Sequence, residues 1–146
     1  MNPITVFQVE RIAFKIAQEK FKFNEPIPEF GTRFPNILES CLAAPLQTFD
    51  GKDLYKSFFD KVAILFYLMI KNHPFQNGNK RIGMTTLFYA LYTNNLWVEI
   101  SNQELYNFAV WVAGSPRDAK DEMIRYIAKF IKGNAVPWEQ EEKNNS

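Results

Sequence analysis

Apolar residues recur at intervals of three and four along most of this chain, which is the period of one face of an α-helix. Prolines, glycines and short polar runs interrupt these stripes at points where helices are expected to end. The spacing predicts six helices, over residues 5–23, 36–44, 53–72, 79–92, 101–113 and 118–133. We therefore expect an all-α fold.

Several of these helices carry end signals. Asp53, Ser101 and Asp118 are residue types that cap helix N-termini, and Glu104 stands at the capping-box position after Ser101. Gly133 is expected to end the last helix, because glycine is common just past a helix C-terminus.

One short extended segment is expected between the helices. Leu46, Thr48 and Phe49 precede the pair Asp50-Gly51, which is typical of a tight hairpin turn. No repeat or linker divides the chain. We therefore predict one domain over residues 1–136, with at most one small hairpin, followed by a polar tail over residues 137–146.

The composition limits the classes of function. The 146 residues include 14 Phe, so aromatic rings are expected to build the core. The chain has 17 Lys and Arg against 16 Asp and Glu, a balance that argues against direct nucleic-acid binding. Functional positive charge is therefore expected to be local, and residues 51–81 hold six basic side chains against two acidic ones.

Cysteine usage and hydropathy favour a soluble, cytoplasmic protein. Cys41 is the one cysteine, so it forms no internal disulfide, and we expect it to be a small buried hydrophobe. No signal-peptide pattern opens the sequence. The longest apolar run, residues 62–70, is far shorter than the roughly 20 residues of a membrane span, so no membrane partner is expected.

The residues best suited to carry out chemistry are 73–81, His-Pro-Phe-Gln-Asn-Gly-Asn-Lys-Arg, which join two apolar helices. A helix N-terminus presents unpaired amides and the positive end of its dipole, so the Gly-Asn-Lys-Arg segment is suited to bind phosphate. His73 is the one histidine, and an imidazole can take a proton from an attacking hydroxyl. Phe75 is expected to turn into the core and hold the loop.

Structural roles for the same residues stay open at this point. A single histidine near a helix end often caps or packs, and a basic pair after a turn is commonly solvated surface. Spacing by itself does not separate these interpretations from phosphate chemistry.

The nine residues resemble the signature of the Fic/Doc (Fido) family, H-x-F-x-[DEN]-[AG]-N-[GK]-R, at every fixed position. Residues 38–52 are similar to the helix and flap that precede this motif in death-on-curing (Doc) proteins, and the likeness extends over about residues 4–132. The resemblance implies a compact Fic/Doc helical bundle with a short β-hairpin flap.

The resemblance also implies a role for each motif residue. His73 would be the general base that activates a hydroxyl of a target protein, and Asn77 would be the Mg²⁺ ligand. The loop that binds the nucleotide phosphates would comprise Gly78, Asn79, Lys80 and Arg81. The flap that docks the target as an added strand would comprise Leu46, Gln47, Thr48 and Phe49. Leu46, Phe49 and Tyr55 are equally compatible with core positions.

Lys80 bears on the reaction. Most Fic adenylyltransferases have Gly at this position, whereas Doc-type members, which this chain resembles, have Lys. The resemblance implies that ATP binds in an inverted orientation, with its γ-phosphate beside the histidine. The implied activity is a toxin kinase that phosphorylates a protein hydroxyl, such as a Thr of elongation factor Tu. Two alternatives stay open. One is adenylylation (AMPylation), and the other is a catalytically weak binding module, because Asn77 offers Mg²⁺ a neutral amide oxygen.

A toxin of this kind implies a partner that restrains it. The inhibitory pattern [ST]-x-x-x-E-[GN] has no match in the terminal segments. The resemblance therefore implies a separate Phd-like antitoxin that folds a disordered tail into a groove. Exposed apolar residues of the first helix and of residues 24–34 are the candidates for that groove.

Overall fold

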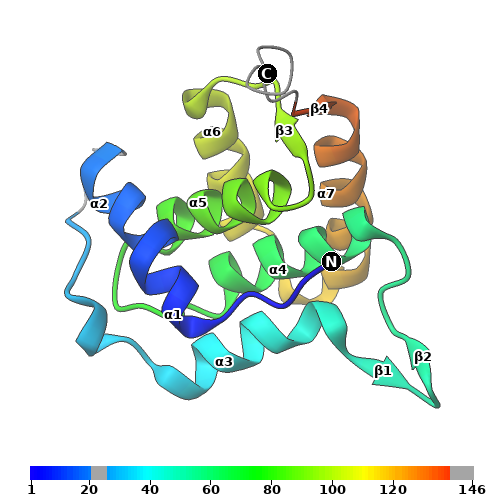
Figure 1. The fold of residues 1–146 in the computed structure, drawn as a ribbon, viewed down its shortest axis with the longest axis horizontal. Coiled ribbons are helices and arrows are strands. Elements are labelled where there is room, and N and C mark those ends of the chain that lie inside the picture. The colour runs from blue at the N-terminus through cyan, green and yellow to red at the C-terminus, as the bar shows by residue number, and fades with distance from the viewer. Residues whose placement is uncertain (21–25, 139–146) are drawn as a thin grey trace, which may run out of the picture.

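Helix α4 (Phe58–Lys71) forms the centre of the molecule in the computed structural model, which describes residues 1–20 and 26–138. It packs against α3, α5, α6 and α7, and lies between α3 and α5 in Figure 1. Most of its residues are buried, including Val62, Leu65 and Met69. A helix that is apolar on all sides is expected at the centre of a bundle.

The other elements surround α4 and confirm the all-α fold with a short hairpin. In chain order they are α1 (Val6–Gln8), a π-helical stretch (Val9–Phe14), α2 (Lys15–Lys20), a 3₁₀ turn (Phe30–Thr32), α3 (Pro35–Ala43), a 3₁₀ turn (Ala44–Leu46), β1 (Thr48–Phe49), β2 (Lys52–Asp53), α5 (Asn79–Tyr92), β3 (Leu96–Val98), α6 (Asn102–Ala113), a 3₁₀ turn (Arg117–Ala119), α7 (Lys120–Asn134) and β4 (Ala135–Pro137). Within residues 1–20 and 26–138, no helix has the length and apolar character needed to cross a membrane.

The first predicted helix is observed from Val6 to Lys20 as one helical segment that contains the π-helical stretch, and we call it the N-terminal helix. Thr5 caps it through a reciprocal capping box with Gln8. Residues 21–23, the predicted end of this helix, lie outside the described residues.

The predicted start of the third helix at Asp53 is wrong. Asp53 pairs with Thr48 in the hairpin, and α4 begins five residues later behind Ser57. The Ser57 hydroxyl accepts from the Asp60 amide at 3.0 Å, and this Ser-x-x-Asp capping box sets the start. The carboxylate of Asp53 instead accepts a hydrogen bond from Lys61 of α4.

The expectation of one small hairpin is confirmed, but the sequence did not predict a second antiparallel pair, which joins β3 to β4 across α6 and α7. Leu96, Trp97 and Val98 pair with Pro137, Val136 and Ala135. Strands of three residues give little signal in a sequence, and their pairing depends on where α5 and α7 end. Pro137, the first residue of the expected tail, is the last residue of β4, and residues 139–146 lie outside the described residues.

The ends of the last two helices fall close to their predicted positions. Ser101 caps α6, with its hydroxyl 3.1 Å from the Glu104 amide. A 3₁₀ turn at Arg117–Ala119 precedes α7, so Asp118 lies just before the helix that it was expected to open. Gly133 lies in the last turn of α7.

The core is more aliphatic than the phenylalanine count suggests. Leu, Ile, Val, Met and Ala make up most of the buried cluster. Among the described phenylalanines, four are buried, namely Phe14, Phe30, Phe66 and Phe75. Three of these four, Phe14, Phe30 and Phe75, meet at the loop that carries the histidine.

Candidate active site

The loop from His73 to Gly78 joins the C-terminus of α4 to the N-terminus of α5. Asn72 caps α4, and His73 follows with a φ of +51°, in the left-handed region that side chains rarely adopt. The carbonyl of Pro74 accepts a hydrogen bond of 2.9 Å from the Phe34 amide. The loop is therefore held from outside at its second residue.

Phe75 anchors the loop in the core, as predicted. Its side chain is 1% exposed, and its ring centroid lies 5.7 Å from that of Phe14 and 5.8 Å from that of Phe30. Phe14 and Phe30 are themselves in edge contact at 5.2 Å. This trio of rings ties the loop to the N-terminal helix and to the turn before α3.

Asn79 closes the loop from within. Its Oδ1 accepts from the Phe75 amide at 2.9 Å, and its Nδ2 donates to the Phe75 carbonyl, also at 2.9 Å. Nδ2 also lies 3.3 Å from Nδ1 of His73. Because both ends of this buried amide are used inside the loop, the group that Asn79 can offer to an anion is its backbone N–H.

Gly78 is required by both conformation and packing. It caps α5 with a φ of +76°, and a Cβ at this position would lie 3.0 Å from Cγ1 of Ile27. Its amide donates to Oδ1 of Asn77 at 2.9 Å. Among the residues that the structure describes, no side chain caps α5, and the first amide to bond within the helix is that of Ile82, to the Gly78 carbonyl. The amides of Asn79 and Lys80 therefore have no acceptor within the helix.

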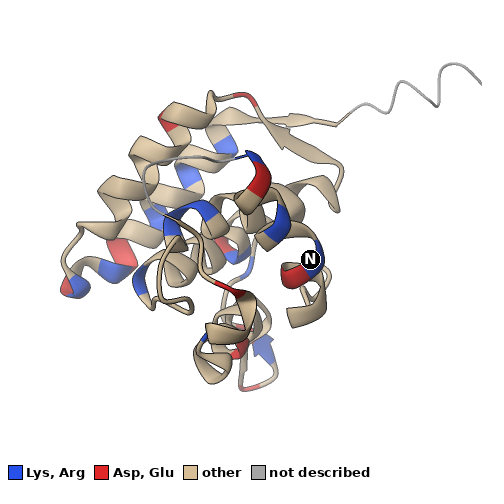
Figure 2. Ribbon diagram, turned by 90° about the vertical axis from the view of Figure 1, so that its left-hand side faces the viewer, with Lys and Arg blue, Asp and Glu red and all other residues tan. Residues whose placement is uncertain are grey.

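Positive charge at the loop comes from Lys80 and Arg81. Lys80 is half-buried, and Arg81 is 4% exposed with its Nη2 3.5 Å from the position of a Cβ on Gly78. The basic side chains of residues 51–81 do not form one strip, because Lys61 bonds to the hairpin and Lys71 to carbonyls at the end of α6. In Figure 2, Lys and Arg lie on several helices among Asp and Glu.

The hairpin of β1 and β2 is the observed form of the predicted flap. Asp50 and Gly51 both have positive φ, as a two-residue type I′ turn requires. All four strand residues are exposed, and Phe49 is 78% exposed, which excludes the core interpretation for this residue. Leu46 and Tyr55, at either side of the hairpin, are half-buried.

Lys61 ties the flap to α4. Its side chain is 8% exposed, and its ammonium donates to Asp53 at 3.2 Å and to the Tyr55 carbonyl. The Leu54 amide bonds to the Gln47 carbonyl at 2.9 Å, one pair below the strands. Nothing local in the sequence identified Lys61, since an isolated lysine in an apolar stripe gives no sign of its partner.

Asn77 and Cys41 were expected to have different roles, Asn77 as the Mg²⁺ ligand and Cys41 as a small buried hydrophobe. No group of three or more His, Cys, Asp or Glu side chains in the described part of the chain could hold a metal ion. Asn77, which was expected to be the Mg²⁺ ligand, is half-buried in the loop. Cys41 is buried in α3, and burial raises the pKa of its thiol to about 12, which agrees with its predicted structural role.

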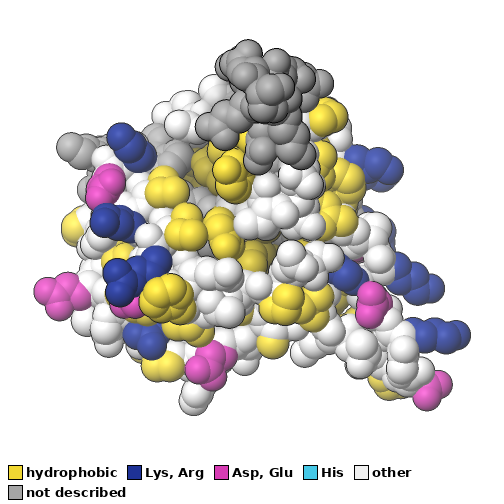
Figure 3. Space-filling model, viewed as in Figure 1, with side chains coloured by type: hydrophobic (Ala, Val, Ile, Leu, Met, Phe, Trp, Pro, Cys, Tyr) yellow, Lys and Arg dark blue, Asp and Glu magenta, His cyan; other side chains and the backbone are white. Residues whose placement is uncertain are grey.

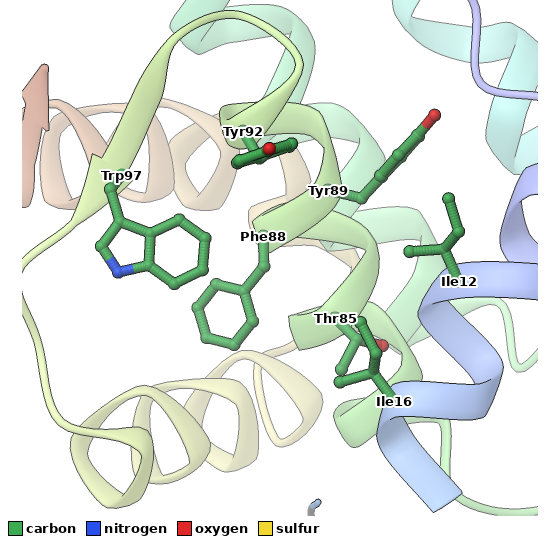
Figure 4. Close-up of a pocket in the computed structure, with 7 residues that line it drawn as sticks. All are labelled: Ile12, Ile16, Thr85, Phe88, Tyr89, Tyr92 and Trp97. Atoms are coloured by element: carbon green, nitrogen blue, oxygen red, sulfur yellow. The ribbon is translucent and has the colours of Figure 1, made fainter. Parts of the chain in front are cut away.

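An apolar hollow of about 340 Å³ lies between the N-terminal helix, α5 and β3. Figure 3 shows apolar side chains gathered around it, and Figure 4 shows Ile12 and Ile16 facing it from the N-terminal helix. Thr85 bridges the two helices by donating to the Ala13 carbonyl at 2.7 Å. Phe88 and Trp97 stack at 5.2 Å on the opposite side.

Comparison with known proteins identifies the family. The family model described as Fic/DOC family matches residues 3–91, which is more than half of the chain. The chain belongs to the Fic/DOC family. The Fic/DOC match contains the complete loop and flap, and it ends at the last turn of α5.

One curated Fic/DOC-related protein gives a finer comparison. Over 68 residues, the chain is 31% identical to "Toxin Doc" of Mycolicibacterium smegmatis. The alignment covers 47% of this chain and 52% of that protein, so the chain spans about half the length of the relative that it matches. No solved structure gave a significant match.

Proposed function

We propose that this Fic/DOC protein transfers a phosphoryl group from ATP to a hydroxyl side chain of another protein. The observation that carries the proposal is the loop itself. The two bonds between the Asn79 amide and the Phe75 backbone form a buried clamp inside the loop. The exposed His73 contacts this clamp and lies beside a helix N-terminus that bears Lys80. An imidazole next to an anion cradle supplies the two groups that base-assisted phosphoryl transfer uses.

In this proposal, the nucleotide phosphates bind at the start of α5. The amides of Asn79 and Lys80, the helix dipole and the charges of Lys80 and Arg81 stabilise the negative charge of the transferred group. His73 takes the proton of the attacking hydroxyl. The new bond forms between that oxygen and the γ-phosphorus, and the bond to the bridging oxygen of ADP breaks.

The residues around Asn77 fit a magnesium ion that is held mainly by nucleotide phosphates. Oδ1 of Asn77 accepts one hydrogen bond, from Gly78, and an amide oxygen has a second lone pair for a cation. Mg²⁺ in nucleotide sites commonly keeps waters and phosphate ligands with few protein ligands. The ion would neutralise phosphate charge.

The flap is proposed to dock the target protein. All four of its strand residues are exposed, and an extended segment can pair with the free edge of a strand. Leu46, Gln47, Thr48 and Phe49 would supply this contact, with a translation factor such as elongation factor Tu as the target. In a cytoplasmic toxin of this type, the flap would select the substrate while the loop performs the transfer.

The apolar hollow is the site proposed for an antitoxin. Ile12 and Ile16 belong to the helix that was expected to contribute to such a groove, and the aromatic side chains of α5 and β3 complete it. The relative named Toxin Doc favours a toxin whose activity is restrained by a Phd-like partner. Docking an amphipathic helix would cover this apolar area.

The experiment that tests the proposal follows the label from ATP. The protein is incubated with γ-labelled or α-labelled ATP and a bacterial lysate. We expect a protein to be labelled from the γ position only, and the His73→Ala variant to lose this labelling. Gln76→Ala, a change in the same loop at an exposed residue, is the matched control and should keep it. Labelling from the α position alone would replace the kinase by an adenylyltransferase.

A second candidate, a binding module without transfer activity, is favoured by the neutral amide of Asn77 at the expected metal ligand. It predicts that expression arrests growth equally for the wild type and for His73→Ala. Relief of arrest by His73→Ala would exclude it.

A further inference from the structure

The clamp inside the loop lies against one ring nitrogen of His73. His73 is exposed, and Nδ1 is the ring nitrogen that faces into the loop, 3.3 Å from Nδ2 of Asn79. The positive φ of His73 keeps the residue in a conformation that costs about 1–2 kcal/mol, so surrounding contacts must hold it there.

The orientation of the Asn79 amide is fixed by the backbone of Phe75. The Phe75 N–H can only donate, so the atom 2.9 Å away must be Oδ1. The Phe75 carbonyl can only accept, so its partner at 2.9 Å must be Nδ2. A flipped amide would place donor against donor and acceptor against acceptor at this buried position. Nδ2 is therefore the group beside the imidazole.

Since the Asn79 Nδ2 group has only protons to offer, Nδ1 of His73 must present its lone pair. We infer that Asn79 is a positioning residue that holds the neutral ring of His73 as the Nε2–H tautomer. In this state Nε2 is a hydrogen-bond donor. The ring has one accepting nitrogen, and Asn79 occupies it.

This inference rests on the proposed function for its consequence. Nε2 can take the proton of a target hydroxyl only after the ring has changed tautomer. One proton leaves Nε2 to water, another reaches Nδ1 from water, and the Asn79 donor moves away from Nδ1. The loop as observed therefore holds the base in a resting form, in which His73 can donate to a phosphate or hydroxyl oxygen but does not accept at Nε2.

Nuclear magnetic resonance of the imidazole nitrogens tests the inference without any activity. Because the chain has one histidine, the ring signals of a 15N-labelled protein purified with a histidine-free tag need no assignment. At a pH where the ring is neutral, we expect Nε2 to be protonated and Nδ1 to resonate as an unprotonated nitrogen. A protonated Nδ1 in the wild type would overturn the inference.

Three variants show whether Asn79 is the cause. Asn79→Asp keeps an acceptor for the Phe75 amide and replaces the donor by a carboxylate, so the proton should move to Nδ1. Asn79→Ala should shift both nitrogens toward the values of an unrestrained histidine. Asn77→Ala is the matched control, since the Asn77 side chain bonds to the Gly78 amide and not to the ring in the described structure, and it should leave the ring signals unchanged.

The outcomes separate this inference from the proposed function. Ring signals that do not differ between the wild type and folded Asn79 variants would overturn the positioning role of Asn79, whether or not the protein labels a target. If the tautomer is as expected but His73→Ala still transfers label, the proposed function fails and the assignment of Asn79 stands. The amide spectrum of each variant reports whether it is folded.

Discussion

The loop that carries His73 and the flap differ in how they are attached to the fold. The loop is held by a buried ring, a buried amide clamp and a backbone bond to Phe34. The flap has no buried strand residue, and the side-chain bonds that join it to the helices in the described part of the chain come from Lys61. A transfer reaction needs fixed geometry, whereas a surface that accepts another chain can be less firmly held.

The largest expected effect comes from removing a ring at each site. Phe75→Ala leaves a cavity among Phe14 and Phe30, and we expect the free energy of unfolding to fall by about 3–5 kcal/mol in urea titrations. Phe49→Ala removes an equal ring from the exposed flap and should change stability by less than about 0.5 kcal/mol. A similar loss of unfolding free energy in the two variants would contradict the conclusion that the loop is held more firmly than the flap.

The second effect compares two glycines with the same φ of +76°. In Gly51→Ala the added methyl meets open space, so only backbone strain of about 1–2 kcal/mol is expected. In Gly78→Ala the methyl also meets Ile27 at 3.0 Å, and overpacking adds about 1–3 kcal/mol. The difference between the melting temperatures of the two variants measures the destabilisation caused by the contact with Ile27. Equal melting temperatures would show that the Ile27 side chain moves aside without destabilising the fold.

A smaller and local effect is expected from Lys61→Met. The methionine fills similar space but cannot bond to Asp53 or Tyr55, so the flap should open more often while the helices stay closed. Hydrogen exchange should accelerate for amides of residues 48–54. Lys52→Met, an exposed change in the flap itself, is the control and should leave the exchange unchanged. Faster exchange throughout α4 would mean that Lys61 supports the whole helix.

The smallest effect concerns Cys41, in the helix that leads to the flap. Burial raises the pKa of this thiol from 9.0 to about 12, so between these pH values the unfolded chain ionises and the folded one does not. Stability should therefore fall more steeply from pH 9 upward in the wild type than in Cys41→Ala, with parallel curves below pH 8. Parallel melting curves at all pH values would show that the folded and unfolded chains ionise Cys41 equally, and would contradict the burial of this thiol.

The helices and the hairpin could be predicted because their signals lie within a few residues. The apolar stripe of α4, the Ser101 cap of α6 and the Asp50-Gly51 turn are local features. The start of α4 was predicted wrongly because both Asp53 and Ser57 can cap a helix. Ser57 is the cap, whereas Asp53 lies in β2 and accepts a hydrogen bond from Lys61. The β3–β4 pair was missed because residues about 40 positions apart form it.

The sequence by itself determined the family signature, the helical class and the place of the histidine between two helices, since each depends on residues close together in the chain. The tertiary structure decided which contacts fix that histidine. Phe14, Phe30 and Phe34 reach the loop from other segments. Asn79 turns its amide inward because Phe75 is buried there and offers its backbone. Such pairings arise when separate segments pack together, so no single window of sequence contains them.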